Sequence, residues 1–121
     1  MPVGKEHKEF HALDMASGWH VPQGYPPGIE QKILAGALDE TARTGNRTRL
    51  LRFQPGARTT KPFVHDYWEE VYILAGDLIA SGGGTEEVFL ANTYACRPPG
   101  IYHGPFRSRT GCLLLETHYY A

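Results

Sequence analysis

The sequence contains little cysteine, and its cysteines are not arranged as a metal-binding pair. Cys96 and Cys112 are the only two, and neither belongs to a CxxC motif. The sequence therefore indicates neither a disulfide framework nor a thiolate zinc site. We expect two packed, reduced thiols, as is typical of a cytoplasmic protein.

Long apolar runs and an excess of one charge are also missing. No stretch approaches the ~18 consecutive apolar residues of a membrane helix. Residues 1–10 include Lys5, Glu6, Lys8 and Glu9, where a signal peptide would be apolar. The 12 Lys and Arg residues nearly balance the 13 Asp and Glu residues, which gives no general attraction to nucleic acid or to an anionic membrane. We predict a cytoplasmic protein that binds a small molecule, with no nucleic-acid or membrane partner.

Glycine and proline, by contrast, are abundant and spread over the whole chain, with 14 Gly and 9 Pro in 121 residues. Regular interruption of short β-rich runs is typical of a sandwich or barrel of hairpins. The length fits one domain, and 41% hydrophobic residues suffice for one core. We predict a polar lead-in over residues 1–18, with a turn or two of helix within residues 6–16, and a single all-β domain over residues 19–121.

This domain is expected to contain about eight to ten short strands. They include residues 29–35, 47–53, 69–74, 78–81, 87–90, 93–96 and 111–120. The prediction is strongest for residues 69–74, because they are rich in β-branched and aromatic side chains. Gly76-Asp77 is predicted to end this strand in a hairpin turn that leads to residues 78–81.

Alternation along the strongest strand places Glu69, Val71 and Ile73 on one face of the sheet. The opposite face carries Tyr72 and Leu74, so both faces are partly apolar. The outer face therefore needs a cover, either another layer of strands or a second subunit. On this ground we predict a homodimer.

Two imidazoles and a carboxylate form the most informative group of polar residues. On a straight strand His65 and Glu69 would lie roughly 13 Å apart at ~3.3 Å per residue, whereas two ligands of one ion are at most ~4 Å apart. A shared ion thus requires a turn at residues 66–68. His103 follows the forced turn of residues 98–100, which can bring it to the same place. Such a set is known for non-haem Fe(II) sites with open positions, and it also suits zinc, manganese or nickel.

These residues lie in two segments that resemble the two motifs of the cupin superfamily. The first motif ends in a glutamate, six residues and a glycine, as Glu69 and Gly76 do. The second reads PxG, two residues and a histidine, as Pro98, Gly100 and His103 do. Further matches resemble the ChrR-like branch, named for the metal-binding domain of an anti-sigma factor, over residues 19–118: Trp19, residues 29–34, 50–53, 55–56, 97–100 and 111–112.

The resemblance implies a single-domain cupin with an RmlC-like jelly roll, or double-stranded β-helix, and a metal ion in the barrel mouth. It assigns the metal to His65, Glu69 and His103, with Fe(II) favoured over Zn, Mn or Ni. The family's first histidine falls on Phe63, and its frequent late asparagine falls on Arg107. The resemblance therefore implies a three-ligand shell.

Function is not settled by a cupin fold. Our first hypothesis is a metal-dependent enzyme acting on a small organic molecule, in particular a non-haem Fe(II) oxygenase or dioxygenase. Four residues are predicted to orient its substrate: Arg52, Tyr67, Tyr102 and Arg107. The alternatives are a non-catalytic sensor of metal or ligand, a metal-dependent isomerase or lyase, and a metal-free barrel that binds its ligand through Arg and Tyr. Glu116 and His118 share a strand face and can reach the pocket, but we do not predict them as ligands.

Overall fold

The computed structural model describes residues 5–121, and this part of the chain contains seven strands and no helix. The strands are β1 (Ile29–Asp39), β2 (Thr44–Phe53), β3 (Trp68–Ala80), β4 (Glu87–Leu90), β5 (Tyr94–Arg97), β6 (Phe106–Arg107) and β7 (Cys112–Tyr119). The predicted all-β class is confirmed, whereas the helical turns predicted within residues 6–16 are wrong. Among residues 5–121 no helix is long and apolar enough to cross a membrane.

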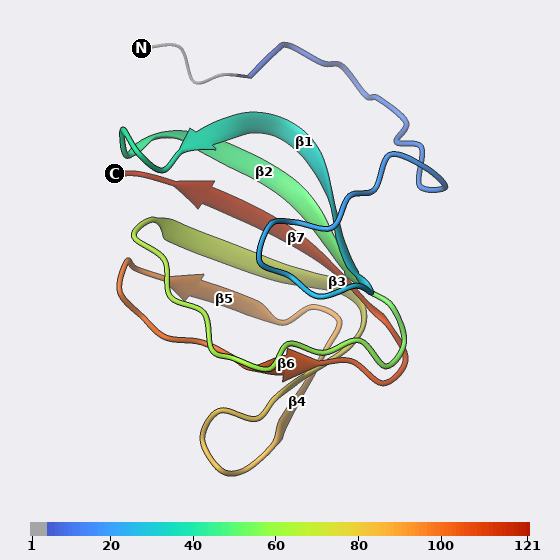
Figure 1. Ribbon diagram of the computed structural model, residues 1–121. Coiled ribbons are helices and arrows are strands. Elements are labelled where there is room, and N and C mark those ends of the chain that lie inside the picture. The colour runs from blue at the N-terminus through green and yellow to red at the C-terminus, as the bar shows by residue number, and fades with distance from the viewer. Residues whose placement is uncertain (1–4) are drawn as a thin grey trace.

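All strand pairs are antiparallel, and they form two layers joined by β3 (Figure 1). The larger sheet has the order β1-β2-β7-β3, with β5 on the far side of the first half of β3. The second half of β3 pairs with β4 and β6 instead. A single strand therefore carries the chain from one layer to the other, and the space between the layers is the barrel interior.

The continuity of β3 corrects the sequence-based prediction of a hairpin at Gly76-Asp77. Gly76 has a φ of 87°, and the register against β7 shifts between Ile73 and Ala75. A Cβ atom at Gly76 would clash with the carbonyl oxygen of Gly111. The glycine thus permits a β-bulge and a close approach of two backbones rather than a turn. Because two expected strands merge into β3, the total is seven rather than about eight to ten.

The inner faces of the strands build an apolar core at one end of the barrel. As predicted, Glu69, Val71 and Ile73 share the inward face of β3, with 4%, 7% and 3% of their surface exposed. The apolar members of the core cluster are Ile29, Leu51, Phe53, Val71, Ile73, Leu78, Cys112 and Leu114. Burial of each large apolar side chain contributes about 1.5–3 kcal/mol.

Toward the other end of the barrel, the inward positions of the same strands carry ionisable side chains. On β7, the buried residues Cys112 and Leu114 are followed by the buried residues Glu116 and His118. In β2 the residues opposite Glu116 and His118 are arginines rather than Leu51 or Phe53. The strand register therefore gathers charged side chains at one end, and this end holds the candidate site.

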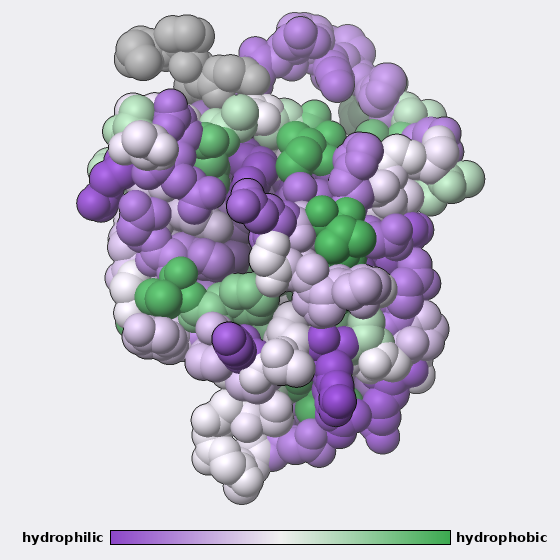
Figure 2. Space-filling view, in the orientation of Figure 1, coloured by the Kyte–Doolittle hydropathy of each residue, from purple (hydrophilic) through white to green (hydrophobic). Residues whose placement is uncertain are grey.

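Part of the segment before β1 contacts the outer face of the larger sheet through Trp19, whereas Tyr25 of the same segment reaches the inward side chain of Arg49. His20 and Gln31 exchange two backbone hydrogen bonds of 3.0 and 2.6 Å. The Arg52 guanidinium lies 3.9 Å from the centre of the Trp19 ring. On the face turned to the viewer in Figure 2, apolar side chains appear as separate groups among polar ones.

Candidate metal centre

His65, Glu69 and His103 come from three parts of the chain that the fold brings together. The chain bends at residues 66–67 before β3 begins, which is the break that ligation by both His65 and Glu69 requires. Phe63 and His103 exchange backbone hydrogen bonds of 2.7 and 2.9 Å. This isolated bridge fixes His103 beside the segment that carries His65.

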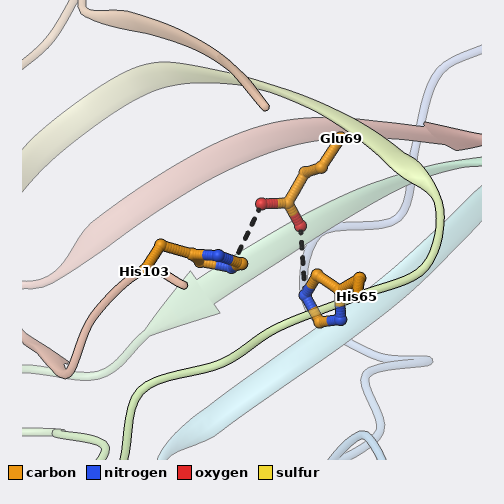
Figure 3. Close-up of side chains that lie close together, drawn as sticks. All are labelled: His65, Glu69 and His103. Atoms are coloured by element: carbon orange, nitrogen blue, oxygen red, sulfur yellow. Dashed lines mark ion pairs between the residues drawn. The ribbon is translucent and has the colours of Figure 1, made fainter. Parts of the chain in front are cut away.

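The donor atoms of these three side chains, which we call the triad, converge on a small volume (Figure 3). Nε2 of His65 lies 3.8 Å from Oε2 of Glu69, and Nε2 of His103 lies 3.5 Å from Oε1. All three ligand atoms are within 4.8 Å of one another. Ligands of one ion at about 2–2.2 Å are up to ~4 Å apart, so small side-chain shifts suffice for shared coordination.

The protonation of the two imidazoles suits a metal ion. Nδ1 of His103 lies 3.2 Å from the carbonyl oxygen of Ile101, which can only accept, so the proton sits on Nδ1 and the lone pair of Nε2 faces Glu69. Burial lowers the pKa of His65 to about 4 and also lowers the pKa of His103. Both rings are therefore neutral near pH 7. Two neutral imidazoles and a carboxylate are a donor set that fits Fe(II), Zn, Mn or Ni.

Glu69 also belongs to a second group of potential ligands, with Glu116 and His118. Nε of Arg49 donates to Oε1 of Glu116 at 2.8 Å, and Nη2 lies 2.7 Å from the same oxygen as an ion pair. Burial alone would raise the pKa of Glu116, but the interactions with Arg49 and His118 together more than offset it and hold the pKa below its usual range. Arg47 donates to Nδ1 of His118. Glu116 and His118 are therefore already paired with arginines, so the triad rather than this second group is the candidate metal centre.

Buried hydrogen bonds extend the site toward β1 and β5. Arg49 donates to Gln31 Oε1 at 2.8 Å and to the hydroxyl of Tyr25 at 3.2 Å. Arg97 donates to Oε1 of Glu69 at 2.9 Å, and its side chain is 22% exposed. These contacts order the polar end of the barrel and place the guanidinium group of Arg97 against the triad carboxylate.

The sequence-based prediction did not include Arg47, Arg49, Arg97 or Tyr25 among the site residues. A signal for the two arginines of β2 was present, because alternation along this strand places Arg47 and Arg49 on the same face as Phe53. Arg97 directly precedes the second motif. Tyr25 lies among prolines in a loop, where no periodicity indicates the direction of a side chain.

A narrow cavity of about 40 Å³ adjoins the triad, and an apolar hollow of about 270 Å³ lies beside it with wall residues in common. Glu69, His103, Phe63 and Tyr25 line the narrow part. Residues on the walls of both are Val71, Leu78, Arg97 and Phe106. The narrow part accommodates an ion with a water molecule or two, and the hollow offers room for the body of a small molecule.

The two arginines predicted to orient substrate pair with glutamates elsewhere. Nη2 of Arg52 donates to Glu30 at 2.9 Å on the outer face of the sheet. Arg107 forms two-pronged hydrogen bonds of 2.9–3.1 Å with Glu86. The guanidinium that contacts the triad directly is that of Arg97.

The two predicted tyrosines lie in contrasting places. Tyr67 is 5% exposed, and its ring stacks on His65 with 4.6 Å between the centroids. Tyr102 is 70% exposed at the surface. Tyr67 therefore packs against the ring of the predicted ligand His65, whereas Tyr102 faces solvent.

Phe63, where the resemblance to the cupin motif predicts a histidine, lies close to two members of the triad. The centre of its ring lies 6.2 Å from that of His65 and 6.0 Å from that of His103. It also stacks on Tyr25 at 5.0 Å. Phe63 therefore fills the place of a fourth ligand with an apolar wall.

Comparisons with known proteins agree with this architecture. A family described as the ChrR cupin-like domain matches residues 8–120. No curated protein matches the chain. A similar fold is that of an RmlC-like cupin from Shewanella frigidimarina, with 19% identity over 94% of this chain and 93% of that chain and a TM-score of 0.67. An acetylacetone dioxygenase from Acinetobacter johnsonii has 16% identity over 95% of this chain and 77% of that chain, with a TM-score of 0.66. The polyketide cyclase RemF from Streptomyces resistomycificus has 18% identity over 93% of this chain and 80% of that chain, with a TM-score of 0.68. At these identities the likeness concerns the fold alone, and it confirms the predicted jelly roll.

Proposed function

The chain belongs to the ChrR cupin-like family, and we propose that it is a metal-dependent enzyme that acts on a small organic molecule. The triad of His65, Glu69 and His103 would hold the ion. The observation that carries the proposal is the convergence of two neutral imidazoles and a carboxylate, with donor atoms within 4.8 Å, beside a cavity. Such a set favours Fe(II) and therefore an oxygenase. The two free thiols, Cys96 and Cys112, suit a reducing cytoplasm.

Charges around the triad favour a substrate with an anionic oxygen. Arg47, Arg49 and Arg97 carry three positive charges, against two negative charges on Glu69 and Glu116. A divalent ion would add to this excess, and the low dielectric of a buried site strengthens its attraction for an anion. A bound Fe(II) would supply open positions for dioxygen and for a substrate oxygen, such as that of an enolate.

Residues of the chain supply the orientation and the dry surroundings. Burial raises the pKa of Tyr25 to about 12, so its hydroxyl keeps its proton and can donate to a substrate oxygen in the narrow cavity. Arg97, between the cavity and the hollow, can pair with a second substrate oxygen. Ile73 and Phe89 in the hollow receive the apolar part of the molecule. A 1,3-dicarbonyl compound with an apolar substituent combines these features.

Metal analysis of protein purified without chelator tests this proposal. We expect near-stoichiometric metal in the wild type, and its loss in His65→Ala and in His103→Ala. The control is His11→Ala, because His11 is exposed and lies in the segment before β1. A His103→Ala variant that keeps its metal, or turns over substrate without metal, would overturn the assignment.

Turnover is tested by dioxygen consumption of the Fe(II)-loaded protein with a series of 1,3-diketones. Consumption that His103→Ala abolishes would support an oxygenase. Conversion with Zn²⁺ and without dioxygen would point to an isomerase or lyase. Tight metal binding without any turnover, together with a copurifying partner protein, would favour the sensor alternative.

The outer face of the larger sheet fits the predicted homodimer. Tyr72 lies opposite Leu115 on one side and Tyr94 on the other, and 37% and 57% of the two tyrosines is exposed. Leu74, which is 42% exposed, extends this apolar row. We expect a sedimentation mass of twice 13.5 kDa, and its reduction to the monomer value in Leu74→Lys. A monomeric wild type would exclude the dimer.

A further inference from the structure

His118 contacts the triad carboxylate with one ring nitrogen and an arginine with the other. The ring is completely buried, and its Nε2 lies 2.9 Å from Oε2 of Glu69. Nε and Nη2 of Arg47 lie 3.1 and 2.9 Å from Nδ1. A guanidinium group has no acceptor, so Nδ1 must present its lone pair to Arg47. The proton of the neutral ring therefore sits on Nε2 and points at Glu69.

His103 presents the opposite form to the same carboxylate. Its Nδ1 donates to the carbonyl oxygen of Ile101, so its Nε2 carries a lone pair. The two histidines thus differ on the side that faces Glu69. His103 presents a lone pair that can bind a metal ion, and His118 presents an N–H group that can donate a hydrogen bond to the carboxylate. The partner of the remote nitrogen makes this difference in both rings.

We propose that Arg47 and His118 form a positioning pair for the metal ligand Glu69. Arg47 fixes His118 in the Nε2–H form, and His118 holds Oε2 of the carboxylate. Arg97 holds the other oxygen at 2.9 Å, so each oxygen has one donor and keeps a free lone pair for an ion. This inference rests on the proposed metal site, and it assigns His118 to orientation rather than to ligation.

The alternative is that His118 is itself a fourth ligand. Ligation through Nε2 would need a lone pair there, and the neutral ring would then place a proton on Nδ1, against the donor groups of Arg47. The two roles make opposite predictions for Arg47→Met. Loss of the tautomer lock weakens metal binding if His118 positions Glu69, whereas it strengthens binding if His118 is held back from ligation.

Zn²⁺ affinity of the full chain, measured by competition with a chelating dye, tests the positioning role. Loss of a hydrogen-bond partner of a metal ligand typically weakens affinity about 10–100-fold, and we expect this for His118→Leu. In His118→Gln a side-chain amide can still donate to Glu69, so most of the affinity should return. The control is His11→Leu, which should bind Zn²⁺ like the wild type. Equal affinities of the wild type and His118→Leu would overturn the inference.

Long-range ¹H–¹⁵N spectra of the wild type give a second readout that needs no variant at His118. We expect the Nε2–H pattern for His118 in the metal-free and in the Zn²⁺-loaded protein, and the Nδ1–H pattern for His103. A Nδ1–H pattern for His118 after loading would show it to be a ligand and overturn this inference, with the proposed function intact. A wild type that binds no Zn²⁺, Fe²⁺, Mn²⁺ or Ni²⁺ would overturn both.

Discussion

The buried ion pair between Arg49 and Glu116 should be the largest single electrostatic contribution to stability. Only 3% of Arg49 and 5% of Glu116 is exposed. In Arg49→Met the apolar stem of the side chain is kept, while the hydrogen bonds to Glu116, Gln31 and Tyr25 are lost. The remaining contact of the Glu116 carboxylate is the Nε2 of His118 at 3.5 Å, too long for a good hydrogen bond.

The expected loss of stability follows from the charge on Glu116, which stays buried without its partner. Removing one partner of a buried pair typically costs about 3–5 kcal/mol, because the other charge stays buried without compensation. For a chain of this size, 1 kcal/mol lowers the melting temperature by roughly 3–5 °C, so Arg49→Met should melt about 9–25 °C lower. Urea unfolding should show a lower midpoint with an unchanged slope.

Two further variants make this reasoning refutable. Arg107 and Glu86 form an exposed pair, with 36% and 52% of the side chains accessible, so Arg107→Met should cost at most about 1 kcal/mol. Replacing both buried partners, in Arg49→Met combined with Glu116→Leu, should recover much of the loss. If Arg49→Met were no more destabilising than Arg107→Met, the ion pair would not have the role described.

Three other outcomes are expected. Phe63→His should add a third imidazole to the triad, as a fourth ligand, and tighten Zn²⁺ binding about tenfold, or about 1.4 kcal/mol, by competition titration; unchanged affinity would mean that the ring at 63 does not reach the ion. Because burial lowers the pKa of His65 to about 4 from 6.5, the unfolded chain binds a proton that the folded metal-free protein does not. Stability should therefore fall as pH drops from 6.5 toward 4, and in His65→Gln this part of the slope in urea midpoints should vanish. Asp77→Ala should cost about 1–3 kcal/mol in urea unfolding, because Asp77 accepts hydrogen bonds from residues 108–110; a loss below 0.5 kcal/mol would contradict this.

The inward face of β3 and the break before it could be predicted because each depends on local geometry. Alternation fixes Glu69 with Val71 and Ile73, and the reach of two ligands around one ion demands a bend after His65. Gly76 was misread because its function is not local. Its missing Cβ makes room for the carbonyl oxygen of Gly111, just before β7, a neighbour that turn propensity cannot reveal.

The choice between the arginines of β2 shows a different limit. Leu50 and Leu51 are consecutive apolar residues, so the strand fits both phases of the alternation, and both leucines are in fact 4% exposed. Arg49 shares the inward phase with Leu51, whereas Arg52 shares the outward phase with Leu50. The apolar residues of this strand therefore do not indicate which phase faces the barrel. The contact that distinguishes the two phases is that of Arg49 with Glu116 on β7, far away in the sequence.

The register of β2 against β7 gives the two inward arginines separate tasks. Arg49 lies opposite Glu116, and Arg47 lies opposite His118, so one cation meets a charge and the other meets a neutral ring. A charge–charge contact in a buried place mainly affects the free energy of unfolding, whereas a contact that fixes a tautomer mainly affects the orientation of the next group. Arg49→Met should therefore lower the melting temperature more than Arg47→Met does. For each variant, the loss of Zn²⁺ affinity can be divided by the fall in melting temperature, and this ratio should be larger for Arg47→Met. Equal ratios for the two variants would mean that the barrel end responds as one cooperative network, in which orientation and stability cannot be separated.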